Sequence, residues 1–463
     1  MLEEDGLVVI VLAAFAIVLL ITLRRGLATD GWLALLAGRS IVQHGLPSYD
    51  NLTVMAHGRR WIDQQWLGQL GLYGLWRAGG VKLALLVHAL LATGALTGPA
   101  LIARRHGATA RAVAWVAIPA LLAYYPVAAV MRTQSFALPL FVATLWLLLD
   151  DARRPSSRVF MTLPLLVLWA NLHGSVVLGA GLVALAGLVT LAKARRPNPR
   201  GLALIFLPWA CLFASPYATH LPAYYRKVLV GGDFSHLVTE WAPTTLQLVT
   251  IPVFILVLAG LWLLGRHGRA VPAFDQLAFL AMTVIAFQAI RNIAWFALVA
   301  LAVLPHLVDR LRVPVEEPRR LNRILALSLL FLTGVALAGV AAKPTSWFTH
   351  AFPTAAARAA ARAAGPQGIV FATSGYADWL LWSEPRLAGR VAFDARFELL
   401  TPSQLEKITR IENAAGDWRT AVRGYRVFVL GPSPDASFER TLRRAFALHV
   451  AFRSRQVVVL RRG

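Results

Sequence analysis

Long apolar runs recur along the first three quarters of this sequence, and they constrain the fold more than any other feature. The runs at 7–23, 81–103 and 324–342 are each at least 17 residues long, which is enough to cross about 30 Å of hydrocarbon. Hydrophobic residues make up 57% of the chain and charged residues only 15%, and the mean hydropathy is +0.60. These values predict a polytopic α-helical membrane protein rather than a soluble one.

We predict eleven membrane spans from these runs. They lie at about 7–23, 81–103, 109–129, 134–149, 159–171, 175–192, 201–215, 246–264, 273–290, 293–308 and 324–342. Positive charges concentrate in the short loops on one side of these spans, which the positive-inside rule assigns to the cytoplasm. This set has seventeen members: Arg104, Arg105, Arg111, Arg153, Arg154, Arg158, Lys193, Arg195, Arg196, Arg200, Arg266, Arg269, Arg310, Arg312, Arg319, Arg320 and Arg323.

The opposite loops hold far fewer cations, namely Arg132, Arg226, Lys227 and Arg291. With eleven spans, the N-terminus is therefore predicted to be cytoplasmic, while the loop 24–79 and the C-terminal region are extracytoplasmic. The formal charge of +23 is explained by this distribution, so nucleic acid is not expected as a partner. The single cysteine, Cys211, excludes an intramolecular disulfide and a thiolate metal cluster.

The sequence predicts two domains. Residues 1–343 form a transmembrane domain, whose first outer loop, 24–79, carries two amphipathic surface helices. Residues 344–463 have a mixed composition typical of a small α/β domain. Helices are predicted at 355–364, 402–412 and 436–447, and strands at 368–372, 390–394, 427–430, 448–452 and 456–460.

Polar residues at the outer ends of the spans are candidates for chemistry, because charged groups at membrane depth are usually functional. Asp30 precedes an amphipathic segment, where a carboxylate could act as a general base or simply cap the helix. Arg132 and Arg291, with the neighbouring amides of Gln134 and Asn292, lie between spans. A guanidinium there suits a phosphate, although it could also snorkel to lipid headgroups.

Two further outer segments are candidates. Asn171 and His173 interrupt a long apolar run, either as a plain tight turn or as irregular backbone that lines a cavity. Glu240 and Trp241 lie late in the outer loop 217–245, where the carboxylate could belong to a site or to a solvated loop. The alternating charges of Asp394, Arg396 and Glu398 indicate either a solvated strand edge or a charged surface that closes over the membrane site.

Taken together, these features resemble the GT-C superfamily of glycosyltransferases, polytopic enzymes that take a sugar from a polyprenyl-phosphate carrier at the outer membrane face. The resemblance covers nearly the whole chain, and more narrowly the chain is similar to a large group of poorly characterised bacterial membrane proteins within that superfamily. The motifs that carry it are Asp30-Gly-Trp, Arg132-Thr-Gln134, Trp169-Ala-Asn-Leu-His-Gly174, Ser215-Pro-Tyr217, Glu240-Trp241, Arg291-Asn292 and Phe393-Asp-Ala-Arg396.

The resemblance implies an extracytoplasmic transfer of a sugar from a polyprenyl-phosphate-linked donor to a glycan, lipid or protein acceptor in the cell envelope. It implies Asp30 as the general base, a catalytic role for Glu240, and phosphate binding by Arg132 and Arg291. The other substrate-binding candidates are Gln134, Asn171, His173, Trp241 and Asn292.

The paired acidic motif of better-known members is missing, since Gly31 and Trp32 follow Asp30. A bound divalent metal is therefore not supported, no cofactor is expected, and an inverting, metal-independent transfer is the natural form. Two other functions stay open from the sequence. One is a non-catalytic protein or scaffold that binds lipid carriers, and the other is a transporter or flippase.

Overall fold

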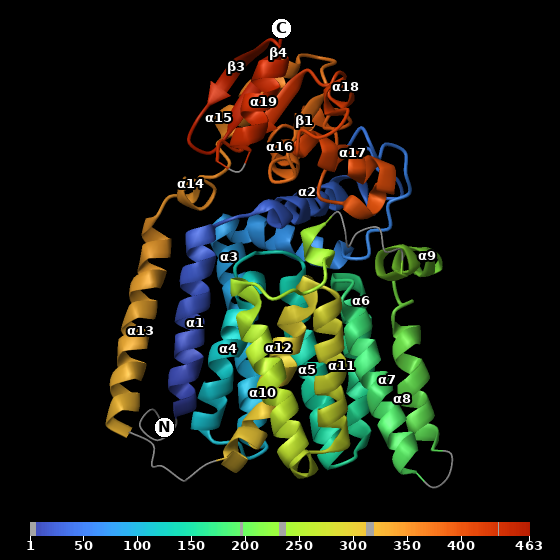
Figure 1. Ribbon diagram of the computed structural model, residues 1–463, viewed down its shortest axis with the longest axis vertical. Coiled ribbons are helices and arrows are strands. Elements are labelled where there is room, and N and C mark those ends of the chain that lie inside the picture. The colour runs from blue at the N-terminus through green and yellow to red at the C-terminus, as the bar shows by residue number, and fades with distance from the viewer. Residues whose placement is uncertain (1–5, 195–197, 231–237, 312–318, 434) are drawn as a thin grey trace. The chain divides into compact units, whose positions relative to one another are not determined.

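The computed structural model describes residues 6–194, 198–230, 238–311, 319–433 and 435–463 (Figure 1). Of the predicted inner-loop cations, Arg195, Arg196 and Arg312 lie outside these ranges. The chain forms two compact units. The first comprises Met1–Arg25, Lys82–Thr219 and Val238–Lys343, and the second comprises Gly26–Val81, His220–Leu237 and Pro344–Gly463.

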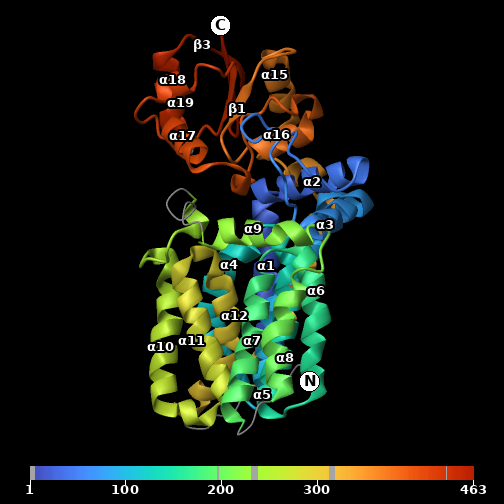
Figure 2. The same ribbon diagram turned by 90° about the vertical axis from the view of Figure 1, so that its right-hand side faces the viewer.

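The first unit is a bundle of helices that run side by side (Figures 1 and 2). Its helices are α1 (Gly6–Arg25), the C-terminal part of α3 (Trp66–Arg105), α4 (Ala110–Ala128), α5 (Gln134–Arg153), α6 (Thr162–Leu172), α7 (Val176–Lys193), α8 (Pro199–Cys211), α10 (Ile251–His267), α11 (Ala273–Gln288), α12 (Ile293–Val308) and α13 (Arg319–Ala342). In the described residues, eight helical segments are long and apolar enough to cross a membrane, and three shorter apolar ones lie at Ser157–Leu172, Pro199–Cys211 and Ala273–Gln288. Each predicted span overlaps one of these eleven segments.

The centre of the bundle is α12, which is buried along nearly its whole length and packs against α4, α10 and α11. Because lipid tails are as apolar as leucine, such helices associate through close packing rather than through a hydrophobic driving force. Gly260 of α10 shows this directly, since a Cβ there would lie 2.2 Å from the ring of Phe279. The rings of Phe141 and Trp295 pack at a centroid distance of 5.0 Å.

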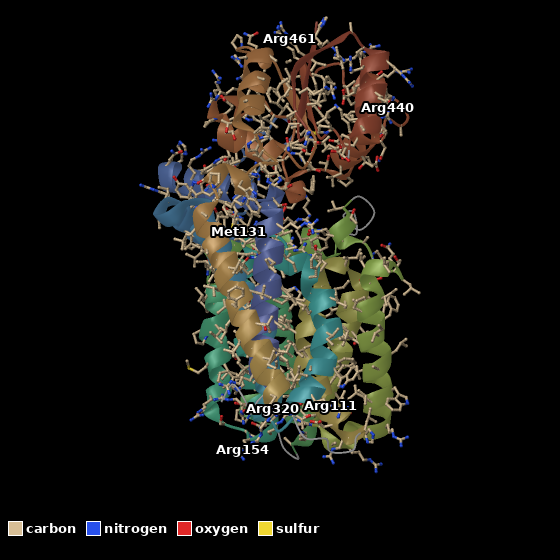
Figure 3. The ribbon with its side chains drawn as sticks, turned by 90° about the vertical axis from the view of Figure 1, so that its left-hand side faces the viewer. Arg111, Met131, Arg154, Arg320, Arg440 and Arg461 are labelled. Atoms are coloured by element: carbon tan, nitrogen blue, oxygen red, sulfur yellow. The ribbon has the colours of Figure 1, made fainter. Side chains whose placement is uncertain are left out.

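The two ends of the bundle differ in chemistry. Arg111, Arg154 and Arg320 lie at one end, and Met131, which precedes Arg132, lies at the other (Figure 3). Three loops that the sequence assigns to one side of the membrane therefore do share one end of this unit.

The second unit contains a four-stranded sheet in the order β1-β2-β4-β3. Strand β1 (Val370–Ala372) runs parallel to β2 (Val427–Leu430), whereas β4 (Val458–Arg462) is antiparallel to both β2 and β3 (Leu448–Arg453). The last strand in sequence thus lies inside the sheet. The main helices of this region are α15 (Thr354–Ala364), α16 (Ala377–Ser383), α17 (Pro402–Glu412), α18 (Trp418–Ala421) and α19 (Ala436–Ala445).

The segment 390–394, predicted as a strand, is not one. Only Val391 forms bridges, to Val370 and Thr53. The segment ends in a turn, where the Asp394 carboxylate accepts a hydrogen bond from the backbone N–H of Arg396 at 3.0 Å. A side chain that bonds the backbone two residues ahead favours a turn over an extended strand.

Residues of the first loop belong to this same unit. The loop forms α2 (Thr29–His44), which packs on α16, and the start of α3 up to Gly79. Gly79 and Gly80 leave helical geometry, and Gly80 has a φ of +65° with open space where a Cβ would be. Glycine is needed there for its backbone conformation rather than for room. Short elements of the described part include α9 (Leu221–Tyr225), α14 (Thr345–Phe348) and the 3-10 turn η9 (Pro385–Leu387).

Candidate functional site

The first unit brings Arg132 and Glu240 into contact. Arg132 lies in the short link between α4 and α5, and Glu240 lies in a 3-10 turn, η4 (Thr239–Trp241). Arg132 Nη1 donates to both carboxylate oxygens of Glu240, at 3.1 and 3.3 Å. The pair is partly open to solvent, since the Glu240 side chain is 50% exposed.

Arg291 stacks beside this pair. It lies in a second 3-10 turn, η7 (Ile290–Asn292), and its guanidinium carbon is 4.2 Å from the ring centroid of Trp241. Backbone hydrogen bonds hold the two turns together, from Ile290 N–H to the Ala242 carbonyl at 3.0 Å and from Thr244 N–H to the Phe287 carbonyl at 3.1 Å. The two arginines, the Glu240 carboxylate and the Trp241 indole therefore form one cluster.

The charges in this group act on one another. Burial by itself would raise the pKa of Glu240, but the positive charges of Arg132 and Arg291 outweigh it and lower that pKa below its ordinary value. Glu240 is therefore ionised at neutral pH. With two guanidinium groups and one carboxylate, the group carries a net positive charge that suits an anionic ligand.

His173 follows α6 and is buried. Its Nδ1 lies 2.7 Å from Ser175 Oγ and accepts a hydrogen bond from Ser175 N–H at 3.1 Å. Burial, together with the charges of Arg291 and Arg132, lowers the pKa of His173 well below its ordinary value. The ring is therefore neutral, and because Nδ1 accepts, the hydrogen-bond network assigns the proton to Nε2.

The amide candidates secure the backbone around this group. Asn171 Nδ2 donates to the carbonyls of Val167 and Ala214, at 2.9 and 2.8 Å. Asn292 Nδ2 donates to the Ile285 carbonyl at 3.1 Å, and Gln134 is buried in the first turn of α5. Their contacts to a substrate stay a prediction.

Asp30 lies in the second unit, in the first turn of α2. It is not the helix N-cap, since that position is Ala28. The capping alternative is therefore wrong, and the position is one where the helix dipole favours a negative charge. Asp30 is half-buried, and its charge acts on Asp378 of α16.

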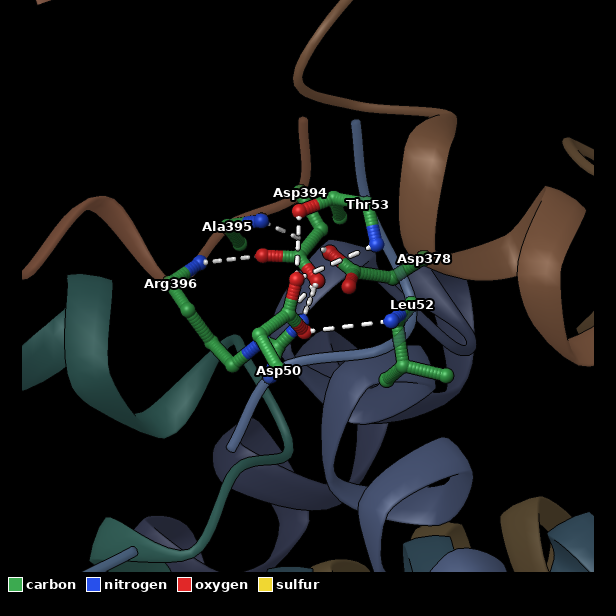
Figure 4. Close-up of polar contacts among 7 residues, drawn as sticks. All are labelled: Asp50, Leu52, Thr53, Asp378, Asp394, Ala395 and Arg396. Atoms are coloured by element: carbon green, nitrogen blue, oxygen red, sulfur yellow. Dashed lines mark hydrogen bonds and ion pairs between the residues drawn. The ribbon is translucent and has the colours of Figure 1, made fainter. Parts of the chain in front are cut away.

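Close to Asp378, the second unit contains a buried ionic cluster that the sequence did not reveal (Figure 4). Arg396 Nη2 donates to Asp50 at 2.6 Å, and Arg396 also binds Asp394 through Nε at 2.9 Å and through Nη2. Trp61 covers the guanidinium, with 4.1 Å from its carbon to the ring centroid. Asp394 and Arg396 are only 4% and 3% exposed, so the interpretation as a solvated strand edge is wrong.

Neither unit offers a metal centre by ligand geometry within the described ranges, because no three or more His, Cys, Asp or Glu side chains gather there suitably for an ion. The acids of the buried cluster are instead bound to the Arg396 guanidinium and to backbone N–H groups.

No family model and no curated protein matches the sequence. Solved structures do match. ArnT from Cupriavidus metallidurans bound to undecaprenyl phosphate aligns with a TM-score of 0.50 over 98% of this chain and 97% of that one, at 15% identity. The chain has a GT-C fold. Two structures of the Archaeoglobus fulgidus oligosaccharyltransferase also align. The apo form gives a TM-score of 0.52 at 13% identity.

The second of these structures, AglB in complex with an inhibitory peptide and a dolichol-phosphate, gives a TM-score of 0.50 at 12% identity. Each covers 91% of this chain and 69% of the other. The GT-C fold and the apolar helices identify a multi-pass membrane protein with a small C-terminal sheet. The fold predicted from the sequence is thus confirmed.

Proposed function

We propose that this GT-C protein is a glycosyltransferase that moves a sugar from a polyprenyl-phosphate-linked donor to an extracytoplasmic acceptor. The observation that carries the proposal is the grouping of Arg132, Arg291, Glu240 and Trp241 in one unit of the fold. Support also comes from two structures with this fold, one bound to undecaprenyl phosphate and one to a dolichol-phosphate.

The reaction needs a base and an anion site. Asp30 takes the proton of the acceptor hydroxyl, whose oxygen then attacks the anomeric carbon of the sugar. The bond from that carbon to the phosphate oxygen breaks, and the lipid phosphate leaves with the electron pair. Negative charge grows on that phosphate, so fixed cations stabilise the transition state more than the ground state.

Arg132 and Arg291 are the proposed cations. Arg291 lies over the ring of Trp241, and Glu240 binds Arg132 and so fixes its direction. His173 has an Nε2–H, which can donate to a sugar hydroxyl or a phosphate oxygen but cannot act as an acid at neutral pH. An attack on the face opposite the leaving group inverts the anomeric centre, and no metal is required for it.

A transfer assay with the purified protein in nanodiscs tests the base. With an undecaprenyl-phosphate-linked sugar, Asp30→Asn is expected to lower the transfer rate by about 10²–10⁴-fold, the usual contribution of general base catalysis, while binding of undecaprenyl phosphate is retained. Asp417→Asn, an exposed carboxylate paired with Arg410, is the matched control. Undiminished transfer by Asp30→Asn would refute the assignment.

The same purified protein also distinguishes a transferase from a non-catalytic carrier-binding protein and from a flippase. A non-catalytic carrier-binding protein would bind undecaprenyl phosphate and transfer nothing, with Asp30→Asn indistinguishable from wild type. A flippase would move a fluorescent lipid phosphate across liposome membranes, independently of Asp30.

The proposed orientation is tested by reporters. An N-terminal reporter is expected to be active in the cytoplasm, and one placed after residue 343 outside it, as the distribution of basic loops predicts.

A further inference from the structure

The buried ionic cluster holds more negative than positive groups. Arg396 contacts the carboxylates of Asp50 and Asp394, and the Asp378 carboxyl group is turned toward both of them (Figure 4). Asp50 is 1% exposed and Asp378 is fully buried. One guanidinium balances one carboxylate, so ionised Asp50 and Asp394 together already leave an excess of one negative charge, and a third buried negative charge would be strongly unfavourable.

The contacts of Asp378 indicate which form it takes. Its Oδ2 accepts a single hydrogen bond from Ala395 N–H, at 3.3 Å. Its Oδ1 is buried and has no hydrogen-bond partner. Asp50 and Asp394, in contrast, each accept bonds from Arg396 and from backbone N–H groups. An ionised carboxylate needs such donors, so Asp378 is the member of the cluster least able to hold a charge.

The surroundings of α16 agree with this assignment. Burial raises the pKa of Asp378 well above its ordinary value, Asp394 raises it further, Arg396 opposes the rise, and Asp30 adds to it. The other charged groups on the elements packed against α16 are engaged elsewhere or exposed. They are Arg39 of α2, which donates to the carbonyls of Leu381 and Trp382, the exposed His44 at the end of α2, Arg386 of η9, which pairs with Glu384, and the exposed Arg358 and Arg362 of α15.

We infer that Asp378 is a positioning residue that stays protonated beside Asp30 and thereby keeps Asp30 ionised. The two residues come from α16 and α2, which pack together. A second negative charge at Asp378 would favour the protonated form of Asp30, which cannot accept a proton. Two nearby carboxyl groups then share one proton unequally, according to their surroundings. The consequence for a base rests on the proposed function, whereas the protonation of Asp378 does not.

Infrared spectroscopy of the full-length protein in nanodiscs tests the inference without any activity. The C=O band of protonated carboxylic acids is expected at pH 7 in wild type, and Asp378→Asn is expected to lose the part that belongs to Asp378, while Asp63 and Glu412, whose pKa values are about 7, leave a remainder. The midpoint at which the Asp378 part of the band disappears with rising pH is expected to fall by about half a pH unit in Asp30→Asn, because one like charge is removed. Glu406→Gln, on the exposed face of α17, is expected to leave the midpoint unchanged.

Two results would overturn the inference. If Asp378→Asn retains the whole band, Asp378 is ionised. If Asp30→Asn leaves the midpoint where it is, the two carboxyls are not coupled. Should Asp378→Asn fail to fold, the titrations of wild type, Asp30→Asn and Glu406→Gln still decide the coupling. If the transferase proposal is wrong, the wild-type protein will show no sugar transfer, while the infrared spectra will still behave as expected here.

Discussion

Two arginine–carboxylate contacts in this protein have similar geometry and opposite surroundings. In the first unit, Arg132 lies 3.1 Å from Glu240, with side chains 16% and 50% exposed. In the second, Arg396 lies 2.6 Å from Asp50, with side chains 2% and 0% exposed. An exposed pair contributes little to stability, and its partners can exchange with a ligand. A buried pair is costly to break, because the remaining charge stays desolvated.

This difference in exposure separates the candidate binding contact, Arg132–Glu240, from a structural contact, Arg396–Asp50. In the proposed function Arg132 releases Glu240 and accepts a phosphate, since solvent and ligand can reach this partly exposed pair. Arg396 cannot do so, because it joins residue 50 of the first loop to residues 394–396 and is covered by Trp61. The burial of Arg396 by itself would lower its pKa, but Asp394 and Asp50 raise it above its ordinary value. Its charge is therefore permanent.

The largest expected effect is that of Arg396→Met, which leaves Asp50 and Asp394 buried without their cation. We expect it to lower the free energy of unfolding by about 3–5 kcal/mol, measured by thermal unfolding of the purified protein with tryptophan fluorescence. Arg410→Met removes an arginine from exposed pairs in the same unit and is expected to cost less than about 1 kcal/mol. Equal losses in the two variants would show that the buried and the exposed ion pairs contribute equally to stability.

Next in size is Arg132→Ala, whose effect is expected on binding rather than on stability. Loss of charged hydrogen bonds to phosphate, about 1.5–3 kcal/mol, weakens undecaprenyl phosphate binding by roughly 10–100-fold. The unfolding temperature should change little. Arg111→Ala, at the opposite end of the bundle (Figure 3), is the matched control, and equal binding losses in both would indicate only a general charge effect.

A smaller effect is expected from Glu240→Gln. The substitution removes the negative charge that opposes Arg132 and Arg291, so binding of undecaprenyl phosphate should tighten by up to about fivefold, the value of an exposed ion pair. Titration of the lipid at two salt concentrations measures this gain and its decrease at high salt. Weaker binding would show that Glu240 itself positions the ligand.

The last prediction concerns the pH dependence of stability. Burial raises the pKa of Asp63 to about 7, above that of the unfolded chain, so the folded state binds more protons between about pH 4 and pH 7. Stability therefore falls as pH rises through this window and levels off above it. Asp63→Asn should reduce the slope without abolishing it, because burial also raises the pKa of Glu412 to about 7. An unchanged slope in thermal unfolding curves at several pH values would exclude Asp63 as its source.

The helices and strands could be predicted from the sequence because each leaves a local pattern of apolar residues. Apolar runs predict helices because the bilayer imposes their length, and the short apolar run Val-Phe-Val-Leu at 427–430 predicts a buried strand. Pairings over long distances leave no such signal. Asp50 and Arg396 are 346 positions apart, and nothing near Asp50 indicates that it will be buried. Charge counting placed Arg132 and Glu240 on one side of the membrane, but their contact required the structure.

The place of β4 in the sheet has a consequence for biosynthesis. Because β4 joins β2 to β3, a nascent chain cannot complete the sheet until residue 462 has left the ribosome. All the apolar helices precede residue 370, so they have been synthesised before any strand of this sheet. Until β4 is available, β1 and β2 can pair but β3 has no neighbour, and a deletion of 458–462 would make that loss permanent.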